Sequence, residues 1–246
     1  MESGIQVPGA ETPFRVSADP RLRASTKQRA YYSFSPHPAW RVIVLDPYDF
    51  SILSRGGGRP GKELGMQDLS KEALDLCQAQ NPNDVMKDGF ARGIAAGPDL
   101  RWVPLNGAVG SSQLVWLRET LADAHQAEQN TVVFSHVVLH PEGTPQGDSH
   151  CLCLLWNYED VLDCLRKAAS PPVAVFCGHT HRGAQYRDEH SGTHHITLAS
   201  PLEVTPGSDA CGVVEAFSDG SLTLRGRGAV PSLLLRRGED AVALQA

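Results

Sequence analysis

The sequence predicts an α/β domain in which helices pack against a mixed sheet. Two short apolar segments, 131–134 and 173–177, enclose a segment of helical periodicity at 157–168. A strand–helix–strand unit of this kind joins two parallel strands through a right-handed crossover. After Gly183 the pattern changes to alternating apolar and polar residues, which is typical of antiparallel strands. Because the chain has 246 residues, of which 41% are hydrophobic, one domain can bury its own core.

The first part of the chain contains a loose polar segment followed by two predicted strands. Residues 1–29 are interrupted by prolines and show neither the period of a strand nor that of a helix. Residues 40–46 form a β-branched run ended by Pro47, so we expect a buried strand that carries Asp46 at its carboxyl end. A strand at 31–34 is expected beside it.

Turn-forming residues dominate the next part of the chain. A glycine-rich loop is expected at 56–65, a weak helix at 69–80, and an irregular span at 81–110. Such a long irregular span usually lies over a surface or lines a site.

The second half of the chain shows sharper periodicity. A helix is predicted at 111–126, with Ser111 as its N-cap candidate, because leucines recur there at helical spacing: Leu114, Leu117 and Leu121. The helix at 157–168 has Asn157 as its N-cap candidate and is stopped by Ser170-Pro171-Pro172. Three further strands are expected, at 193–199, 212–217 and 221–224, the last two joined by an Asp219-Gly220 turn. We therefore expect one domain over 30–230 and a C-terminal tail at 231–246.

Composition excludes several classes of partner. Lys and Arg number 22 against 28 Asp and Glu, a formal charge of −6, so we expect no broad basic surface for nucleic acid or anionic lipid. The chain has neither the roughly 18-residue apolar run of a membrane span nor a secretory signal, which favours a cytoplasmic protein. Its six cysteines form no CxxC pair and are expected to be reduced and structural.

Histidines follow the two central predicted strands at the point where each strand ends. His136 comes after 131–134, and His179 and His181 come after 173–177 in a Gly-His-Thr-His sequence. Because the carboxyl ends of parallel strands meet at one edge of a sheet, these side chains are expected to converge there. Imidazole nitrogen binds Zn, Mn, Fe or Ni, so the ligand type predicts a divalent metal site without choosing the metal.

These strand ends resemble the last two metal-binding motifs of the calcineurin-like metallophosphoesterases. Further stretches occur in matching order and narrow the resemblance to the manganese-dependent ADP-ribose/CDP-alcohol diphosphatase family. They are Tyr31-Tyr32-Ser33-Phe34, Val44-Leu45-Asp46-Pro47-Tyr48-Asp49, Gln113-Leu114-Val115-Trp116-Leu117, Leu155-Trp156-Asn157-Tyr158, His195-Ile196-Thr197-Leu198 and Arg225-Gly226-Arg227-Gly228. The resemblance covers about residues 30–230.

The resemblance implies a metallophosphoesterase-like fold of four layers, with mixed sheets packed against helices. It implies a two-metal hydrolase that cleaves the phosphoanhydride of ADP-ribose, CDP-choline or related small nucleotide diphosphates. His136, His179 and His181 take the positions of metal ligands. Manganese is the cofactor implied, with Zn, Fe and Mg left open.

Three motifs that the family carries before these stretches are absent in their place here. They are Asp-x-His/Gln, Gly-Asp-x-x-Asp with its bridging carboxylate, and Gly-Asn-His-Glu/Asp. We therefore expect a form without the N-terminal strands of the fold, whose catalysis is impaired or lost. Asp148-Ser149-His150 follows His136 in the wrong order and is expected to be a surface loop, and Asn106-Gly107 lacks the following histidine. Arg182 replaces an expected Asp after the Gly-His-Thr-His sequence and is expected to be solvated.

Two other readings of the function stay open at this point. One is a non-catalytic metal- or nucleotide-binding or interaction protein derived from the family. The other is a mononuclear hydrolase with three histidine ligands, similar to zinc enzymes with an open coordination position. A P-loop is not favoured at 56–63, because Glu63 stands where the phosphate-binding form needs Ser or Thr.

Overall fold

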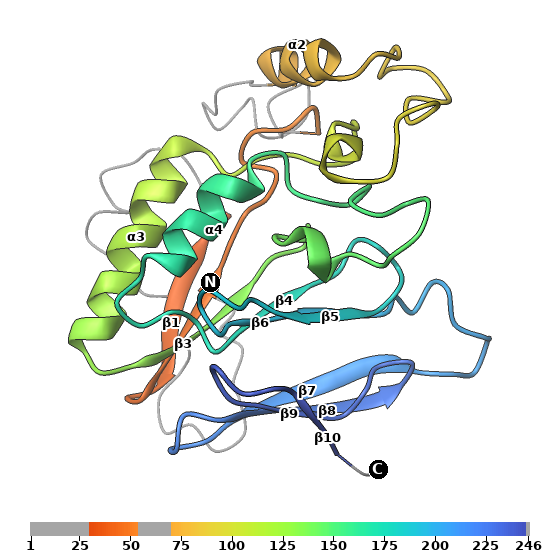
Figure 1. Ribbon diagram of the computed structural model, residues 1–246. Coiled ribbons are helices and arrows are strands. Elements are labelled where there is room, and N and C mark those ends of the chain that lie inside the picture. The colour runs from red at the N-terminus through yellow and green to blue at the C-terminus, as the bar shows by residue number, and fades with distance from the viewer. Residues whose placement is uncertain (1–29, 54–69, 245–246) are drawn as a thin grey trace, which may run out of the picture.

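The computed structural model describes residues 30–53 and 70–244, and these form three stacked layers. Helices α3 (Ser111–Gln126) and α4 (Tyr158–Arg166) cover one face of a six-stranded sheet, and a four-stranded sheet lies against its other face (Figure 1). The predicted α/β class with mixed sheets is confirmed. A fourth layer, which the resemblance implies, is not found within the described ranges. The predicted segment 1–29 and the glycine-rich loop at 56–65 lie outside those ranges.

The six-stranded sheet is parallel in its centre and antiparallel at both edges. Its strands run in the order β1 (Tyr32–His37), β2 (Trp40–Val44), β3 (Asn130–Phe134), β4 (Ala174–Cys177), β6 (His194–Thr197) and β5 (Ala184–Arg187). Strands β2, β3, β4 and β6 pair in parallel. Phe134 lies opposite both Val44 and Phe176, so β2, β3 and β4 end at the same edge, as predicted.

The apolar runs of the central strands are explained by burial on both faces. In β3, Val133 belongs to the core beneath the helices, whereas Val132 packs into the core between the two sheets. In β4, Val175 and Phe176 alternate in the same way. A strand covered on both sides needs apolar residues at every position.

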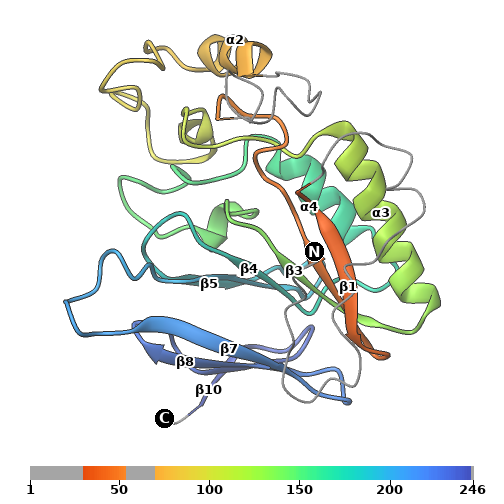
Figure 2. The same cartoon turned by 180° about the vertical axis from the view of Figure 1, so that it is seen from behind.

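Both predicted helices form, with small shifts of their bounds. Helix α3 begins at Ser111 with Gly110 as its N-cap, and it buries Leu117 and Leu121 against the sheet. Helix α4 begins after Asn157, as predicted, and places acidic residues in its first turn and Arg166 in its last, which suits the helix dipole. Figure 2 shows the two helices side by side on the sheet.

Of the chain between β2 and α3, the described residues 70–102 lie over the top of the molecule (Figures 1 and 2). They contain the weakly predicted helix, α2 (Ser70–Gln80), and the short 3-10 helix η2 (Pro98–Arg101). A second short helix, η3 (Pro141–Gly143), follows β3. Among the described residues, no helix has the length and apolar character that crossing a membrane requires.

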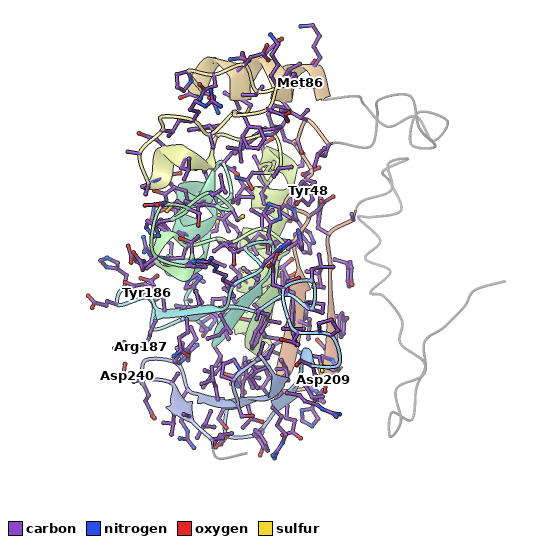
Figure 3. The ribbon with its side chains drawn as sticks, turned by 90° about the vertical axis from the view of Figure 1, so that its right-hand side faces the viewer. Tyr48, Met86, Tyr186, Arg187, Asp209 and Asp240 are labelled. Atoms are coloured by element: carbon purple, nitrogen blue, oxygen red, sulfur yellow. The ribbon has the colours of Figure 1, made fainter. Side chains whose placement is uncertain are left out.

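The four-stranded sheet is antiparallel and includes residues expected to form a tail. Its order is β10 (Val242–Ala243), β9 (Leu233–Leu235), β8 (Leu222–Gly228) and β7 (Ala210–Ala216). Leu233 and Leu235 are buried in the core between the sheets, beside Leu222 and Leu224. Because alternate leucines of β9 face that core, residues 231–244 pack as part of the two-sheet sandwich and do not form a separate tail. Arg187 of β5 also bonds Asp240 across the sandwich, at 2.9 Å from Nε to Oδ1 (Figure 3).

Strand β5 is not predicted by the sequence pattern. Its residues, Ala184–Arg187, show no apolar alternation, and they form an edge strand that pairs with β6 alone.

Candidate metal centre

The parallel register brings the two predicted histidine-bearing strand ends together. His136 follows β3 and His179 follows β4, and their ring centroids lie 4.9 Å apart at an interplanar angle of 60°. The backbone N–H of Gly178 donates to the carbonyl of His136 at 3.0 Å, which joins the two strand ends. The structure therefore places His136 and His179 side by side, as the sequence predicts.

The Gly-His-Thr-His turn has an unusual backbone. His179 and His181 adopt positive φ angles of 70° and 60°, in the left-handed region that non-glycine residues seldom occupy. The N–H of Thr180 donates to the carbonyl of Gly178 at 2.8 Å, which tightens the turn. Strained backbone of this kind gathers at functional sites.

His181 is turned toward a different partner. Its side chain is 44% exposed, and Nδ1 lies 3.1 Å from Oε1 of Glu203. Among the residues that the structure describes, no three His, Cys, Asp or Glu side chains lie close enough to hold a metal ion together. The assignment of all three histidines as ligands of one site stays a prediction.

The local electrostatics favour neutral imidazoles. Burial lowers the pKa of His179 to about 4, assisted by the nearby charges of His136 and His181. Burial also lowers the pKa of His136, and His181 adds to this effect. A neutral ring keeps the lone pair that a metal ion needs, so these two side chains are suited to bind one at neutral pH.

Three neighbours of the histidine pair could not be inferred from sequence spacing. Asn106 places its Oδ1 3.0 Å from Nε2 of His179. The ring of Tyr48 lies 6.1 Å from that of His136, and burial, together with Cys153 and Asp46, raises the pKa of Tyr48 to about 12. Cys153 donates its thiol hydrogen to the carbonyl of His179 at 3.7 Å. Figure 3 shows Tyr48 below Met86, which follows α2 in the chain, and above the sheets.

Three residues that were not expected to be metal ligands, His150, Arg182 and Asp46, have other surroundings. His150 lies in a turn, with Nδ1 2.9 Å from the hydroxyl oxygen of Thr144, and Arg182 is exposed, as predicted. Asp46 stands at the end of β2, where its Oδ1 accepts the backbone N–H of Tyr48 at 3.0 Å.

Comparison with known proteins identifies relatives of this chain. It is 38% identical over 191 residues to the manganese-dependent ADP-ribose/CDP-alcohol diphosphatase of Oryza sativa, which covers 78% of this chain and 54% of the relative. The diphosphatase of the same name from Mus musculus is 31% identical over 229 residues, or 93% of this chain and 61% of the relative. The chain is homologous to these diphosphatases.

The fold agrees with this homology to the diphosphatases. A dimetal phosphatase from Danio rerio superposes with a TM-score of 0.72 and 28% identity, over 84% of this chain and 60% of that chain. No family model matches the sequence. The chain spans little more than half the length of the diphosphatases that it matches.

The donors present fit one part of a metal centre. Two neutral imidazoles, His136 and His179, offer nitrogen ligands that suit divalent transition metals. Two cations at close range repel each other, and anionic oxygen ligands are needed to offset that repulsion. The carboxylate of Glu203 bonds His181 and thus contacts the turn at one end. The described residues thus provide nitrogen ligands without a complete site for two ions.

Proposed function

We propose that this chain carries the histidine side of a metal-dependent centre that hydrolyses phosphoanhydrides. The observation that supports it is the pairing of His136 and His179 at the ends of adjacent parallel strands, in a chain homologous to named manganese-dependent diphosphatases. ADP-ribose and CDP-alcohols are the substrates we propose, from the names of those relatives.

Each residue of the centre has a role in this proposal. His136 and His179 hold a divalent ion, manganese by homology, and His181 joins them if it leaves Glu203. A bound divalent ion lowers the pKa of water and neutralises phosphate charge. The ring of Tyr48 lies beside that of His136, with 6.1 Å between the ring centroids. With its raised pKa, Tyr48 keeps its hydroxyl proton at neutral pH and can donate a hydrogen bond to a phosphate oxygen.

The test compares hydrolysis with and without carboxylate motifs. ADP-ribose and CDP-choline hydrolysis with Mn²⁺ is measured for this chain and for a fusion that adds the preceding segment of the rice relative. We expect the fusion to be active and the chain alone to be at least about 100-fold slower, since both ions must be held for the reaction. His179→Gln should abolish activity in the fusion, and Arg182→Gln, an exposed neighbour, should leave it intact. Equal rates for the chain and the fusion would contradict the requirement for the added motifs.

A second candidate function is metal or nucleotide binding without catalysis. It is favoured by the finding that no three potential ligands converge in the described ranges. Calorimetry with Mn²⁺ on the fusion separates the candidates: two ions per molecule support the hydrolase, and one ion or none supports a binding protein without catalysis.

We also propose a cytosolic location, which the six free cysteines support because that compartment keeps thiols reduced. Fractionation of cells that express the tagged chain tests this, and recovery in a secreted or organellar fraction would refute it.

A further inference from the structure

The side chain of Asn106 is fully buried and held in one orientation. It is 0% exposed, and its amide Nδ2 donates both hydrogens to main-chain carbonyls, those of Arg101 and Leu152, each at 2.8 Å. Rotating the amide by half a turn would point Oδ1 at two carbonyl oxygens. Because oxygen cannot donate, the hydrogen-bond pattern fixes which end of the amide faces His179.

The oxygen of Asn106 therefore faces the ring of His179. Oδ1 lies 3.0 Å from Nε2, and an oxygen acceptor at that distance requires a hydrogen on the nitrogen. This holds whether the ring is neutral or charged. In the neutral ring, the remaining lone pair then belongs to Nδ1.

The main chain around Asn106 is equally constrained. Its N–H donates to the carbonyl of Val103 at 3.2 Å, and its carbonyl accepts the hydroxyl of Ser51 at 3.2 Å. A Cβ on Gly107 would lie 2.5 Å from the carbonyl oxygen of Pro47, so the chain after Asn106 packs closely on the end of β2. Asn106 is thus a rigid support rather than a side chain that adapts to the ring.

We infer that Asn106 is a positioning residue that holds His179 in its Nε2–H form and presents Nδ1 as the metal-binding atom. The metal-binding part of this inference rests on the proposed function, whereas the ring form can be measured in the metal-free chain. Partners of this kind orient a ligating imidazole and usually change metal affinity by about 10–100-fold.

The first measurement uses the unaltered chain. Histidine labelled with ¹⁵N is incorporated, and long-range proton–nitrogen spectra are recorded without metal at about pH 8, where histidines are neutral. The His179 signals are assigned from their loss in His179→Gln. We expect a protonated Nε2 and an unprotonated Nδ1. An Nδ1–H form of His179 would overturn the inference without any variant of Asn106.

The second measurement adds Zn²⁺, a diamagnetic probe, to the unaltered chain and to two variants. Asn106→Ala should show a mixture of the two ring forms at His179 and bind Zn²⁺ about 10–100-fold more weakly. Ser51→Ala is the matched control, because it perturbs the same main chain without touching Oδ1, and it should keep both properties. If folded Asn106→Ala retains the Nε2–H form and its Zn²⁺ affinity, the inference fails. If the unaltered chain binds no Zn²⁺, the proposed function fails while the ring form of His179 still decides the role of Asn106.

Discussion

The guanidinium of Arg166 binds the buried carboxylate of Asp188 through two hydrogen bonds, Nε–H to Oδ2 at 2.8 Å and Nη2–H to Oδ1 at 3.2 Å. Arg166 ends α4, and Asp188 follows β5, so this pair fastens the helix to the edge of the sheet. Nη2 also lies 3.2 Å from Nε2 of His140, in the segment that leads on from His136. Burial alone would raise the pKa of Asp188, but hydrogen bonds from Arg166, His190 N–H and Ser191 lower it to about 2.

Replacement of Arg166 should destabilise the fold. Arg166→Met leaves the carboxylate of Asp188, which is 1% exposed, without its cation, and we expect a loss of about 3–5 kcal/mol in the free energy of unfolding. Urea denaturation measures it. Lys167→Met is the matched control, since its ion pair with Asp163 is exposed, and it should change stability by less than about 0.5 kcal/mol. Similar losses for both variants would contradict the importance of burial.

Acid should destabilise the protein at pH values well above the pKa of Asp188. Burial lowers the pKa of His140 to about 4 and that of His195 to about 3. In the unfolded chain both titrate near 6.5, so between about pH 4 and 6.5 the unfolded state binds more protons and stability falls as pH falls. Each histidine should lower the free energy of unfolding by about 2 kcal/mol at pH 5 relative to pH 7.5, since the slope is about 1.4 kcal/mol per pH unit.

His195→Leu provides the control for this pH dependence. Both ring nitrogens of His195 lack a hydrogen-bond partner among the described residues, so an apolar side chain of similar volume should be tolerated near neutral pH. Urea denaturation at the two pH values should show about 2 kcal/mol less acid sensitivity in this variant. An unchanged pH profile would show that His195 is not the group that must be protonated on unfolding.

Cysteine reactivity should distinguish one thiol from the other five. Cys211 on β7 is exposed, whereas burial raises the pKa of Cys153 and Cys77 to about 11 and that of Cys177 to about 12. A thiol reagent near pH 7.5 should label one cysteine per native chain rapidly and all six after denaturation, because the thiolate is the reacting species. Mass spectrometry of Cys211→Ser should show loss of the rapid label. Rapid labelling of two or more sites would contradict the described burial.

Close packing at Gly107 should make it intolerant of a side chain. A Cβ there would lie 2.5 Å from the carbonyl oxygen of Pro47 and 2.8 Å from Cβ of Ser51, so Gly107→Ala should destabilise the protein by about 1–3 kcal/mol. Gly183→Ala, where the nearest atom lies at 3.6 Å, is the matched control and should be nearly neutral. Thermal unfolding of the two variants checks this, and equal melting temperatures would show that the loop yields.

The central sheet could be predicted because its physical requirements are local. A strand buried on both faces needs a continuous apolar run, and segments 131–134 and 173–177 provide one each. Parallel pairing then places His136 and His179 at one edge without knowledge of any contact. Strand β9 could not be assigned in this way, because its short leucine run is equally consistent with an apolar tail, and only its pairing with β8 and β10 makes it a strand.

The environment of the histidines was beyond sequence reasoning for a different reason. Asn106 lies 73 residues before His179, in a span without strand or helix periodicity, so no pattern predicts where its side chain points. Glu203 likewise meets His181 through a loop after β6. Residue type indicates what a side chain can bind, whereas the course of irregular segments decides what it meets.

His179 and His181 both have a left-handed backbone, which is unfavourable for residues other than glycine. A left-handed conformation costs an ordinary residue about 1–2 kcal/mol, and glycine adopts it freely. Selection for thermal robustness alone would therefore drift toward glycine at both positions, at the expense of the imidazoles. A related chain that no longer binds metal at this turn is therefore expected to gain stability when either histidine is replaced by glycine.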